Sequence, residues 1–283
     1  MLRAIDTSNE ADAIDILARG LAKRPRAFWQ TCLARLHRFG GNAEANTPVG
    51  HLLMDGSTAV GVVLTPASVR IDTNGRQQRL INMSSWYIEP EHRWRGPMML
   101  RSLVRDPDAV YTDLTPTDSV QKILVALGFK PINAGESIVI LPRAAIGSGH
   151  GARLVALDAV PEHGIPARTR HLLSQHTDYG CLALALEVDG CWHPLLFKSC
   201  ERRRIPGVRL VCCESHTLLK RCIAPIARYL LNRGKLFLIR DLGPGEEAGF
   251  GFARPGFALK YAKGGEFLDR TDFVGTELSL FDL

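Results

Sequence analysis

Apolar positions in the first part of the chain follow a helical period and then an extended one. Thr7 and Glu10 have the spacing of a capping box, and apolar residues then recur at intervals of three and four. Arg24-Pro25-Arg26 interrupts this period, which resumes until Gly40-Gly41. The pattern predicts a short starting strand followed by two helices.

The next stretch has the alternation and turn residues of antiparallel strands. Asp55-Gly56 lies between two apolar runs, and Asn74-Gly75 lies between two more, so each pair is typical of a hairpin. The last arm continues into Ser84–Ile88. We expect these further elements: a helix over 97–104, a strand over 109–114, a helix over 118–127 and a strand over 137–141.

The second half repeats this order without repeating the residues. Its Asp189-Gly190 turn follows a helical segment, and a strand ending at Cys213, a helix over 218–231 and a strand over 235–239 come next. Between the halves, residues 142–152 are small and flexible, as in a linker. We therefore expect an α/β (α+β) protein of two tandem domains, 1–145 and 146–283, each with a mixed, mostly antiparallel central sheet flanked by helices.

Composition narrows the class of protein. With 283 residues, 46% hydrophobic and 23% charged, the chain has the make-up of a folded globular protein with room for two cores. It has neither an apolar run long enough to span a bilayer nor a signal peptide, so we expect a cytoplasmic protein with no membrane partner. Its seven cysteines form no C-x-x-C pair, which favours reduced structural thiols over disulfides or a metal site.

The net charge of +6 indicates affinity for anions without saying which. Nucleic acid is disfavoured as a partner because basic residues are not interleaved with aromatic ones. The run Arg202-Arg203-Arg204 is compatible with an anionic acceptor or with a solvated loop, and we favour the loop.

One segment combines a strand, a turn and a helix in the order that suits phosphate binding. Arg93, Arg95 and Gly96 come between the strand that ends at Ile88 and the helix that starts near Pro97. A helix N-terminus and guanidinium groups both attract phosphate. The sequence therefore predicts an anion site at this turn.

Here the chain resembles the acyl-CoA N-acyltransferase (GNAT) superfamily. The family signature is Arg/Gln-x-x-Gly-x-Gly/Ala after a central strand, and Arg93-x-x-Gly96-x-Met98 matches it except that Met98 replaces a small residue. The later Leu127-Gly128-Phe129 also falls in the family's order, so the resemblance covers residues 1–142. In the second half the corresponding turn, 214–218, has an acid and no glycine or arginine, which implies a degenerate second copy.

The resemblance implies acetyl-CoA or another acyl-CoA as the donor substrate. Main-chain amides at the central strand would polarise the thioester, and a splay between this strand and the strand over 109–114 would hold the pantetheine arm. The cofactor-binding residues implied are Tyr87, Ile88, Arg93, Trp94, Arg95, Gly96, Pro97 and Met98.

The family's usual general acid is absent. A tyrosine commonly stands four residues before the Gly-Phe pair, and this chain has Leu124 there. Tyr111 and Ser84 are the candidate catalytic residues. Further candidates are Ser85, Asn82 and His92. Each has a structural alternative: a half-buried strand residue for Tyr111, a β-bulge for Ser84-Ser85 and an exposed turn for His92.

Two functions remain open at this point. One is an acyl-CoA-dependent acyltransferase acting on a small amine or hydroxyl acceptor. The other is a non-catalytic module that keeps coenzyme A or acyl-CoA as a ligand, which Leu124 and Met98 would suit.

Overall fold

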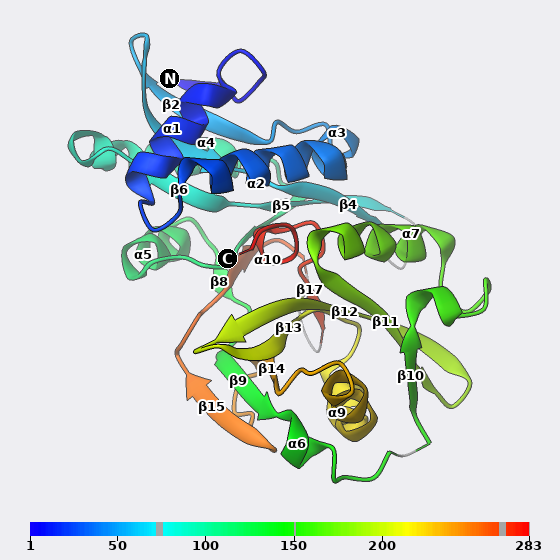
Figure 1. Cartoon of the computed structure of the whole chain (residues 1–283). Helices are drawn as coiled ribbons and strands as arrows, with labels where there is room; N and C mark the ends of the chain where they lie inside the picture. Colours follow the sequence, from blue (N-terminus) through cyan, green and yellow to red (C-terminus); the bar gives the residue numbers. More distant parts are fainter. Residues whose placement is uncertain (72–75, 150, 266–269, 283) are drawn as a thin grey trace. The chain divides into compact units, whose positions relative to one another are not determined.

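A computed structural model describes residues 1–71, 76–149, 151–265 and 270–282. The chain forms two compact units, and the chain ranges of both are discontinuous (Figure 1). Unit 1 comprises Met1–Pro131, Lys260–Gly265 and Gly275–Leu283, and unit 2 comprises Ile132–Leu259 and Glu266–Val274.

Unit 1 contains the predicted pair of helices and the predicted hairpins. Its helices are α1 (Glu10–Gly20), α2 (Arg26–Phe39), α3 (Gly41–Glu44), the 3-10 helix η1 (Pro90–Arg95), α4 (Gly96–Leu103), α5 (Asp118–Ala126) and α10 (Glu277–Leu280). Its strands are β1 (Leu2–Ala4), β2 (Gly50–Asp55), β3 (Thr58–Leu64), β4 (Ala67–Ile71), β5 (Gln77–Asn82), β6 (Ser84–Ile88), β7 (Ala109–Asp113), β8 (Lys130–Pro131) and β16 (Tyr261–Lys263). The predicted Asn74-Gly75 turn lies outside the described residues.

The strands of unit 1 form two sheets, in the orders β1-β2-β3-β6 and β4-β5-β7-β16-β8. Helices α1 and α2 cover one face of the strands (Figure 1), and the apolar stripe of α1 is buried there: Ala13, Ile14, Ile16 and Leu17. Within the described residues no helix combines the length and the hydrophobicity that a bilayer-spanning segment needs.

Unit 2 is built on one long sheet that curves around α9 (Figure 1). Its helices are α6 (Leu141–Ala144), η2 (Leu157–Ala159), α7 (Ala167–Gln175), η3 (His176–Tyr179), α8 (His216–Arg221) and α9 (Ile223–Leu231). Its strands are β9 (Gly135–Ile140), β10 (Arg153–Ala156), β11 (Cys181–Val188), β12 (Cys191–Arg202), β13 (Ile205–Cys213), β14 (Phe237–Leu242), β15 (Gly251–Pro255) and β17 (Thr271–Asp272).

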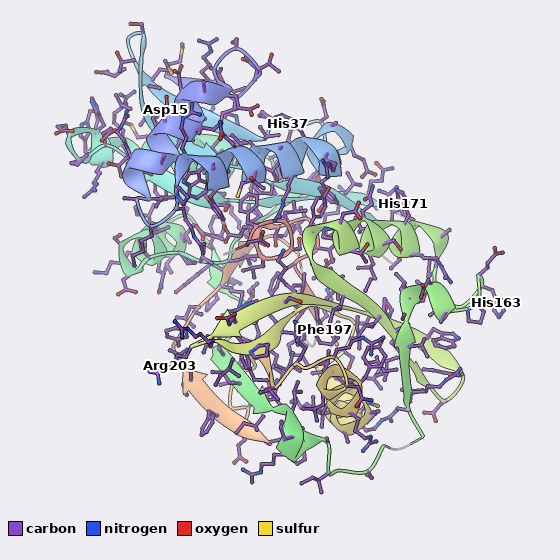
Figure 2. All side chains as sticks on the ribbon, viewed as in Figure 1. Asp15, His37, His163, His171, Phe197 and Arg203 are labelled. Atoms are coloured by element: carbon purple, nitrogen blue, oxygen red, sulfur yellow. The ribbon has the colours of Figure 1, made fainter. Side chains whose placement is uncertain are left out.

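The core of unit 2 lies between this sheet and its helices. The order β10-β11-β12-β13-β14-β9-β15 brings apolar side chains of six strands into one cluster with those of α9, and Phe197 is fully buried among them (Figure 2). Cys213 and Cys222 belong to the same cluster, consistent with structural thiols. The predicted helix over 218–231 is two helices separated at Cys222, so Pro225 lies in the first turn of α9, where a proline is tolerated.

Two strands lie in the unit opposite to the one expected from their place in the sequence. The strand predicted over 137–141 was expected to finish the first domain, but as β9 it pairs with β14 and β15 of unit 2. Conversely, β16 follows β15 in the sequence and pairs with β7 and β8 of unit 1. The units divide after Pro131, and the expected linker belongs to unit 2, where Leu141 and Ala144 are buried. Apolar patterning predicts a strand but does not specify its partner.

Candidate functional site

The central strand of unit 1 changes partner halfway along. β5 runs parallel to β7 as far as the pair Asn82–Thr112, whereas β6 pairs only with β3. At this point the amide of Met83 donates to the carbonyl of Thr112 at 2.7 Å. Ser85 has a φ of 51°, and the β3–β6 register shifts beside it. The bulge interpretation of Ser84-Ser85 is thus confirmed, and an opening separates β6 from β7, as the splay prediction requires.

A cavity of about 610 Å³ lies at this opening. Its volume is in the range of small-molecule sites. The loop after α1, strand β6, the loop after β7 and helix α10 all contribute to it. The lining residues are Gly20, Leu21, Ala22, Lys23, Arg24, Trp29, Met83, Ser84, Ser85, Trp86, Asp113, Thr115, Pro116, Thr117, Val120 and Glu277.

A buried carboxylate is held at the centre of this lining. Glu277 is 1% exposed, and its oxygens accept hydrogen bonds from the hydroxyls of Ser84 and, at 2.8 Å, Thr115. Its amide donates to Oδ1 of Asn82 at 3.1 Å. Asn82 is itself fully buried, and its Nδ2 lies 3.3 Å from the hydroxyl of Thr112. The side chain of Glu277 is therefore fixed by β6 and the loop after β7, and its backbone by β5.

Asp113 supplies a second buried carboxyl group at the end of β7. Burial and the charge of Glu277 raise the pKa of Asp113 well above its usual range. Burial also raises the pKa of Glu277, although the hydroxyls of Ser84 and Thr115 and the ammonium of Lys260 oppose this. Because the charge of Glu277 disfavours ionisation of Asp113, the two carboxyl groups resist being ionised together. Such a pair can accept or release a proton closer to neutral pH than an exposed carboxyl group can.

Hydrogen-bond donors and cations surround the pair. Among the described residues, the buried indole N–H groups of Trp29 and Trp86 have no acceptor, and both side chains line the cavity. Lys23 and Arg24 line it from the loop between α1 and α2. The cavity lining thus combines two cationic side chains with the two carboxyl groups.

The edge of β6 that faces away from β3 can donate backbone hydrogen bonds. The amide of Glu89 donates to the carbonyl of Val60 at 2.9 Å, so the amides of Glu89 and Tyr87 point towards β3 and that of Ile88 points the other way. Of the two amides implied by the family resemblance, only that of Ile88 can meet a ligand. The ring of Tyr87 packs on Gly20, where an added Cβ would lie 2.1 Å from the ring.

The predicted phosphate turn is the 3-10 helix η1, which runs directly into α4. The amide of Gly96 donates to the carbonyl of Arg93, so it is not free for a phosphate. Arg95 is also engaged: its guanidinium donates to the carbonyl of Met54 at 2.9 Å. Gly96 packs closely on Trp86, because an added Cβ would lie 3.1 Å from its ring. Pro90 has the fixed φ that favours this helical start.

Other predicted cofactor-binding residues remain accessible. Arg93 is exposed, and its Nε donates a long hydrogen bond of 3.5 Å to the carbonyl of Ile88. Trp94, Pro97 and Met98 are exposed as well. Arg93 is therefore the side chain at this bend best able to reach a phosphate.

The two predicted catalytic residues lie in different places. Ser84 is in the cavity, hydrogen-bonded to Glu277, with Ser85 beside it at 3.1 Å. Tyr111 does not line the cavity: it is 3% exposed, and its phenol oxygen accepts the amide of Asp106 at 3.1 Å. This contact holds Tyr111 in the middle of β7, away from the cavity lining, and its catalytic role stays a prediction. His92 does not line the cavity either.

Leu124 is fully buried in α5, and the amide of Phe129 donates to its carbonyl at 3.0 Å. Gly128 has a φ of 85°, as the predicted helix C-cap requires. In the second half, Ser215 caps α8, since its Oγ accepts the amide of Leu218 at 3.1 Å. The Ser215 hydroxyl therefore already accepts an amide at this helix N-terminus, where the first half was predicted to bind phosphate.

Glu277 and Asp113 were not identified from the sequence. Asp113 lies at the end of β7, within the strand predicted over 109–114 next to the central one, and a polar residue at that position is a usable signal. Glu277 has no local signal, because it is 193 residues from Ser84 and reaches the site only through the return of the C-terminal segment to unit 1.

No protein-family model matches the chain, and no curated protein matches it in sequence. Solved structures do match. A GCN5-related N-acetyltransferase from Anabaena variabilis is 10% identical, with a TM-score of 0.58 over 93% of this chain and 72% of that one. A putative acetyltransferase from Pyrococcus horikoshii is 12% identical, with a TM-score of 0.52 over 99% and 92%.

A third, a GCN5-related N-acetyltransferase from Kribbella flavida, is 13% identical, with a TM-score of 0.51 over 93% of this chain and 70% of that one. At such identities the likeness concerns the fold, and it extends over nearly the whole chain. The fold class predicted from the sequence is confirmed: the chain has the fold of the GCN5-related N-acetyltransferases.

Proposed function

We propose that the protein is an acyl-CoA-dependent N-acyltransferase in which Glu277 takes a proton from a small amine acceptor. The observation that carries the proposal is the position of Glu277. A buried carboxylate with a raised pKa lies in the opening between β6 and β7, hydrogen-bonded to the hydroxyl of Ser84. An amine is protonated near neutral pH and must lose a proton before it attacks, and a carboxylate of raised pKa suits that task.

The donor substrate would lie along the open edge of β6. The Ile88 amide is aimed to hydrogen-bond a thioester carbonyl there and to stabilise the oxyanion that forms from it. Arg93 would contact the diphosphate, and the exposed Met98 occupies the place of the family's small residue. Supplied with an acyl thioester, the site needs only to position two reactants and move one proton.

The proton path follows the contacts of Glu277. Glu277 accepts the amine proton as nitrogen attacks the carbonyl carbon. When the carbon–sulfur bond breaks, Ser84 gives its hydroxyl proton to the leaving thiolate and regains one from Glu277. Counted from the neutral amine, the net change is the transfer of the acyl group from sulfur to nitrogen and of one proton from nitrogen to sulfur; the proton that the ammonium form loses before attack passes to solvent. The charge of Glu277 in turn favours the protonated form of Asp113.

The entrance of the cavity favours a particular kind of acceptor. Lys23 and Arg24 line the cavity above the carboxyl pair, so an acceptor with a carboxylate or phosphate group next to its amine would gain two favourable contacts. Free indole donors at Trp29 and Trp86 favour oxygen acceptors on the same molecule.

The test has two stages. Acetyl-CoA is expected to raise the melting temperature of the wild-type protein, and Arg93→Ala is expected to reduce that shift. The matched control is Arg101→Ala, an exposed arginine at the other end of α4. Thiol release from acetyl-CoA is then measured with a library of amines, with and without acidic groups.

The outcomes separate the two functions left open by the sequence. Thiol release that depends on an amine supports the transferase. A melting shift without release with any amine would identify a non-catalytic acyl-CoA-binding protein. Equal shifts in wild type and Arg93→Ala would exclude the proposed diphosphate contact.

A further inference from the structure

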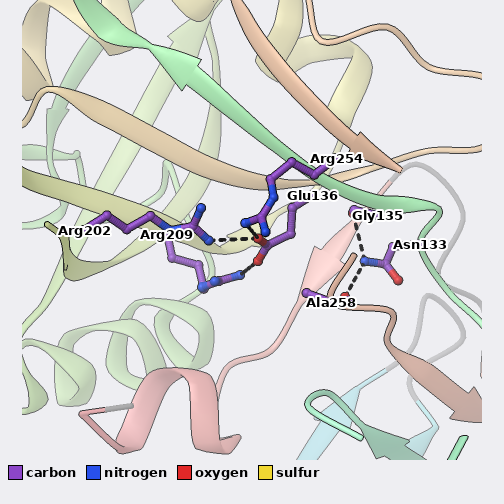
Figure 3. Close-up of polar contacts among 7 residues, drawn as sticks. All are labelled: Asn133, Gly135, Glu136, Arg202, Arg209, Arg254 and Ala258. Carbon is purple, nitrogen blue, oxygen red and sulfur yellow. Dashed lines mark hydrogen bonds and ion pairs between the residues drawn. The ribbon is translucent and has the colours of Figure 1, made fainter. Parts of the chain in front are cut away.

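Unit 2 contains a group of arginines around one buried carboxylate (Figure 3). Glu136 on β9 is 1% exposed on its side chain, and its oxygens lie 3.0 Å from Arg202 on β12, 2.7 Å from Arg209 on β13 and 3.8 Å from Arg254 on β15. We call Glu136 and these three residues the arginine cluster. It spans five neighbouring strands of the sheet.

Cations outnumber acids in this part of unit 2. One arginine suffices to neutralise a buried carboxylate. Asp241 lies opposite Glu136 across β9 and β14 and adds a second negative charge to the same face. Against these two acids and the exposed Glu201 stand the three clustered arginines and, directly after Arg202 at the exposed hairpin turn, Arg203 (Figure 2) and Arg204. Adjacent positive charges repel one another, so an added anion would stabilise the group.

Each arginine of the cluster has N–H donors that Glu136 does not use. Among the described residues, Arg202, Arg209 and Arg254 contact no carboxylate other than Glu136, and each guanidinium has five N–H donors. The side chains of Arg202 and Arg254 are 34% and 36% exposed, whereas Glu136 is almost inaccessible. Glu136 therefore fixes the inner edges of the guanidinium groups and leaves outer edges accessible.

Arg254 is held from a second direction. Its guanidinium carbon lies 3.2 Å from the centre of the Phe257 ring, in a stacked cation–π contact. Arginines that are held in place lose less conformational entropy when they bind an anion. Their planar guanidinium groups can donate two parallel hydrogen bonds to the oxygens of phosphate or sulfate.

We propose that the arginine cluster of unit 2 is a binding site for a small doubly charged oxyanion, such as a phosphate or sulfate group. The buried Glu136 preorganises the site, and Arg202 and Arg254 supply the outer donors. The site belongs to unit 2 alone and does not depend on the proposed acyl transfer in unit 1.

The experiment measures anion binding to the full chain without acetyl-CoA. Inorganic phosphate, sulfate and acetate are titrated calorimetrically against the protein at constant ionic strength set by chloride. Arg254→Ala is the test variant, and Arg202→Ala is a second one in case the first does not fold. The control is Arg233→Ala. The guanidinium carbon of Arg233 lies 3.6 Å from the centre of the Tyr229 ring, so Arg233 also stacks on an aromatic ring, but it follows α9 and is not part of the arginine cluster.

We expect phosphate or sulfate to bind the wild type and the Arg233→Ala protein equally. Binding to Arg254→Ala should be about tenfold weaker, the loss expected for one charge-assisted hydrogen bond. The comparison of phosphate with sulfate identifies the favoured oxyanion, and acetate should bind much more weakly. Absence of phosphate and sulfate binding to the wild type, or equal weakening in Arg254→Ala and Arg233→Ala, would overturn the proposal.

Discussion

Replacing Glu277 by glutamine removes the proposed base with almost no change in volume. Glutamine keeps one carbonyl oxygen, which can still accept one of the two hydroxyls that Glu277 accepts from Ser84 and Thr115. Its amide nitrogen cannot accept the other. The variant thus loses one hydrogen bond, one buried charge and the ability to take a proton.

The expected loss follows from the role assigned to this carboxylate. General base catalysis contributes about 100- to 10,000-fold, so kcat should fall by that factor. The KM for acetyl-CoA should change little, because Ile88 and Arg93 lie on other elements. Stability should be maintained or improved at neutral pH, since burial raises the pKa of Glu277 and its charge is unfavourable in the folded protein.

The assay follows thiol release with the best amine across a pH series. In the wild type, kcat/KM should rise with pH through a pKa above the usual 4.5 of a glutamate, because the base must be unprotonated to act. In Glu277→Gln this rise should vanish. The control is Glu10→Gln, which removes a surface carboxylate that contacts His37 at 3.0 Å outside the cavity.

Two results would refute the reasoning. One is a Glu277→Gln protein that folds, binds acetyl-CoA and releases thiol at the wild-type rate. The other is a pH profile that Glu277→Gln leaves unchanged. Either would mean that the acceptor is deprotonated elsewhere.

Three further predictions test other parts of the structure. Because burial and Glu277 raise the pKa of Asp113, its contribution to stability is present at low pH and is lost as pH rises from its ordinary 3.8 through the raised value. Asp113→Asn should therefore raise the free energy of unfolding at pH 7 more than at pH 4, by about 1.4 kcal/mol for each unit by which the pKa is raised; denaturant unfolding at the two pH values measures this, and an equal change at both would contradict it. Met98→Ala should tighten acetyl-CoA binding a few-fold in calorimetry by giving the diphosphate room; weaker binding would mean that Met98 contacts the ligand favourably. A fragment of residues 1–145 should lack cooperative unfolding by circular dichroism, since it lacks β16, which pairs with both β7 and β8; a sharp transition would show that unit 1 folds without that strand.

The local sequence pattern was sufficient to predict most of the helices and strands and the fold class. The Asp55-Gly56 hairpin and the Gly128 C-cap are each specified by neighbouring residues, and each is where the sequence placed it. The capping box predicted at Thr7 and Glu10 is wrong, because α1 begins at Glu10 with Asn9 as its N-cap and no side-chain capping hydrogen bond. The splay between β6 and β7 was reached through the family resemblance, and the structure adds its cause, the bulge at Ser85.

The pairing of strands that are distant in the chain could not be predicted from the sequence. The exchange of β9 and β16 between units cannot be inferred from apolar alternation, because both strands have the same pattern wherever they pair. Glu277 enters the cavity for the same reason, as part of a segment that returns to unit 1. The helical form of the turn at 90–95 was also missed, since a proline and a glycine near an arginine suit a tight turn and a 3-10 helix equally.

The most direct test is the position of acetyl-CoA in a crystal structure of its complex with this protein. We predict that the thioester carbonyl oxygen lies within about 3 Å of the Ile88 nitrogen, in the opening between β6 and β7, with the diphosphate at Arg93. A ligand bound in unit 2, or bound to unit 1 with its thioester remote from Ile88 and Glu277, would contradict the assignment.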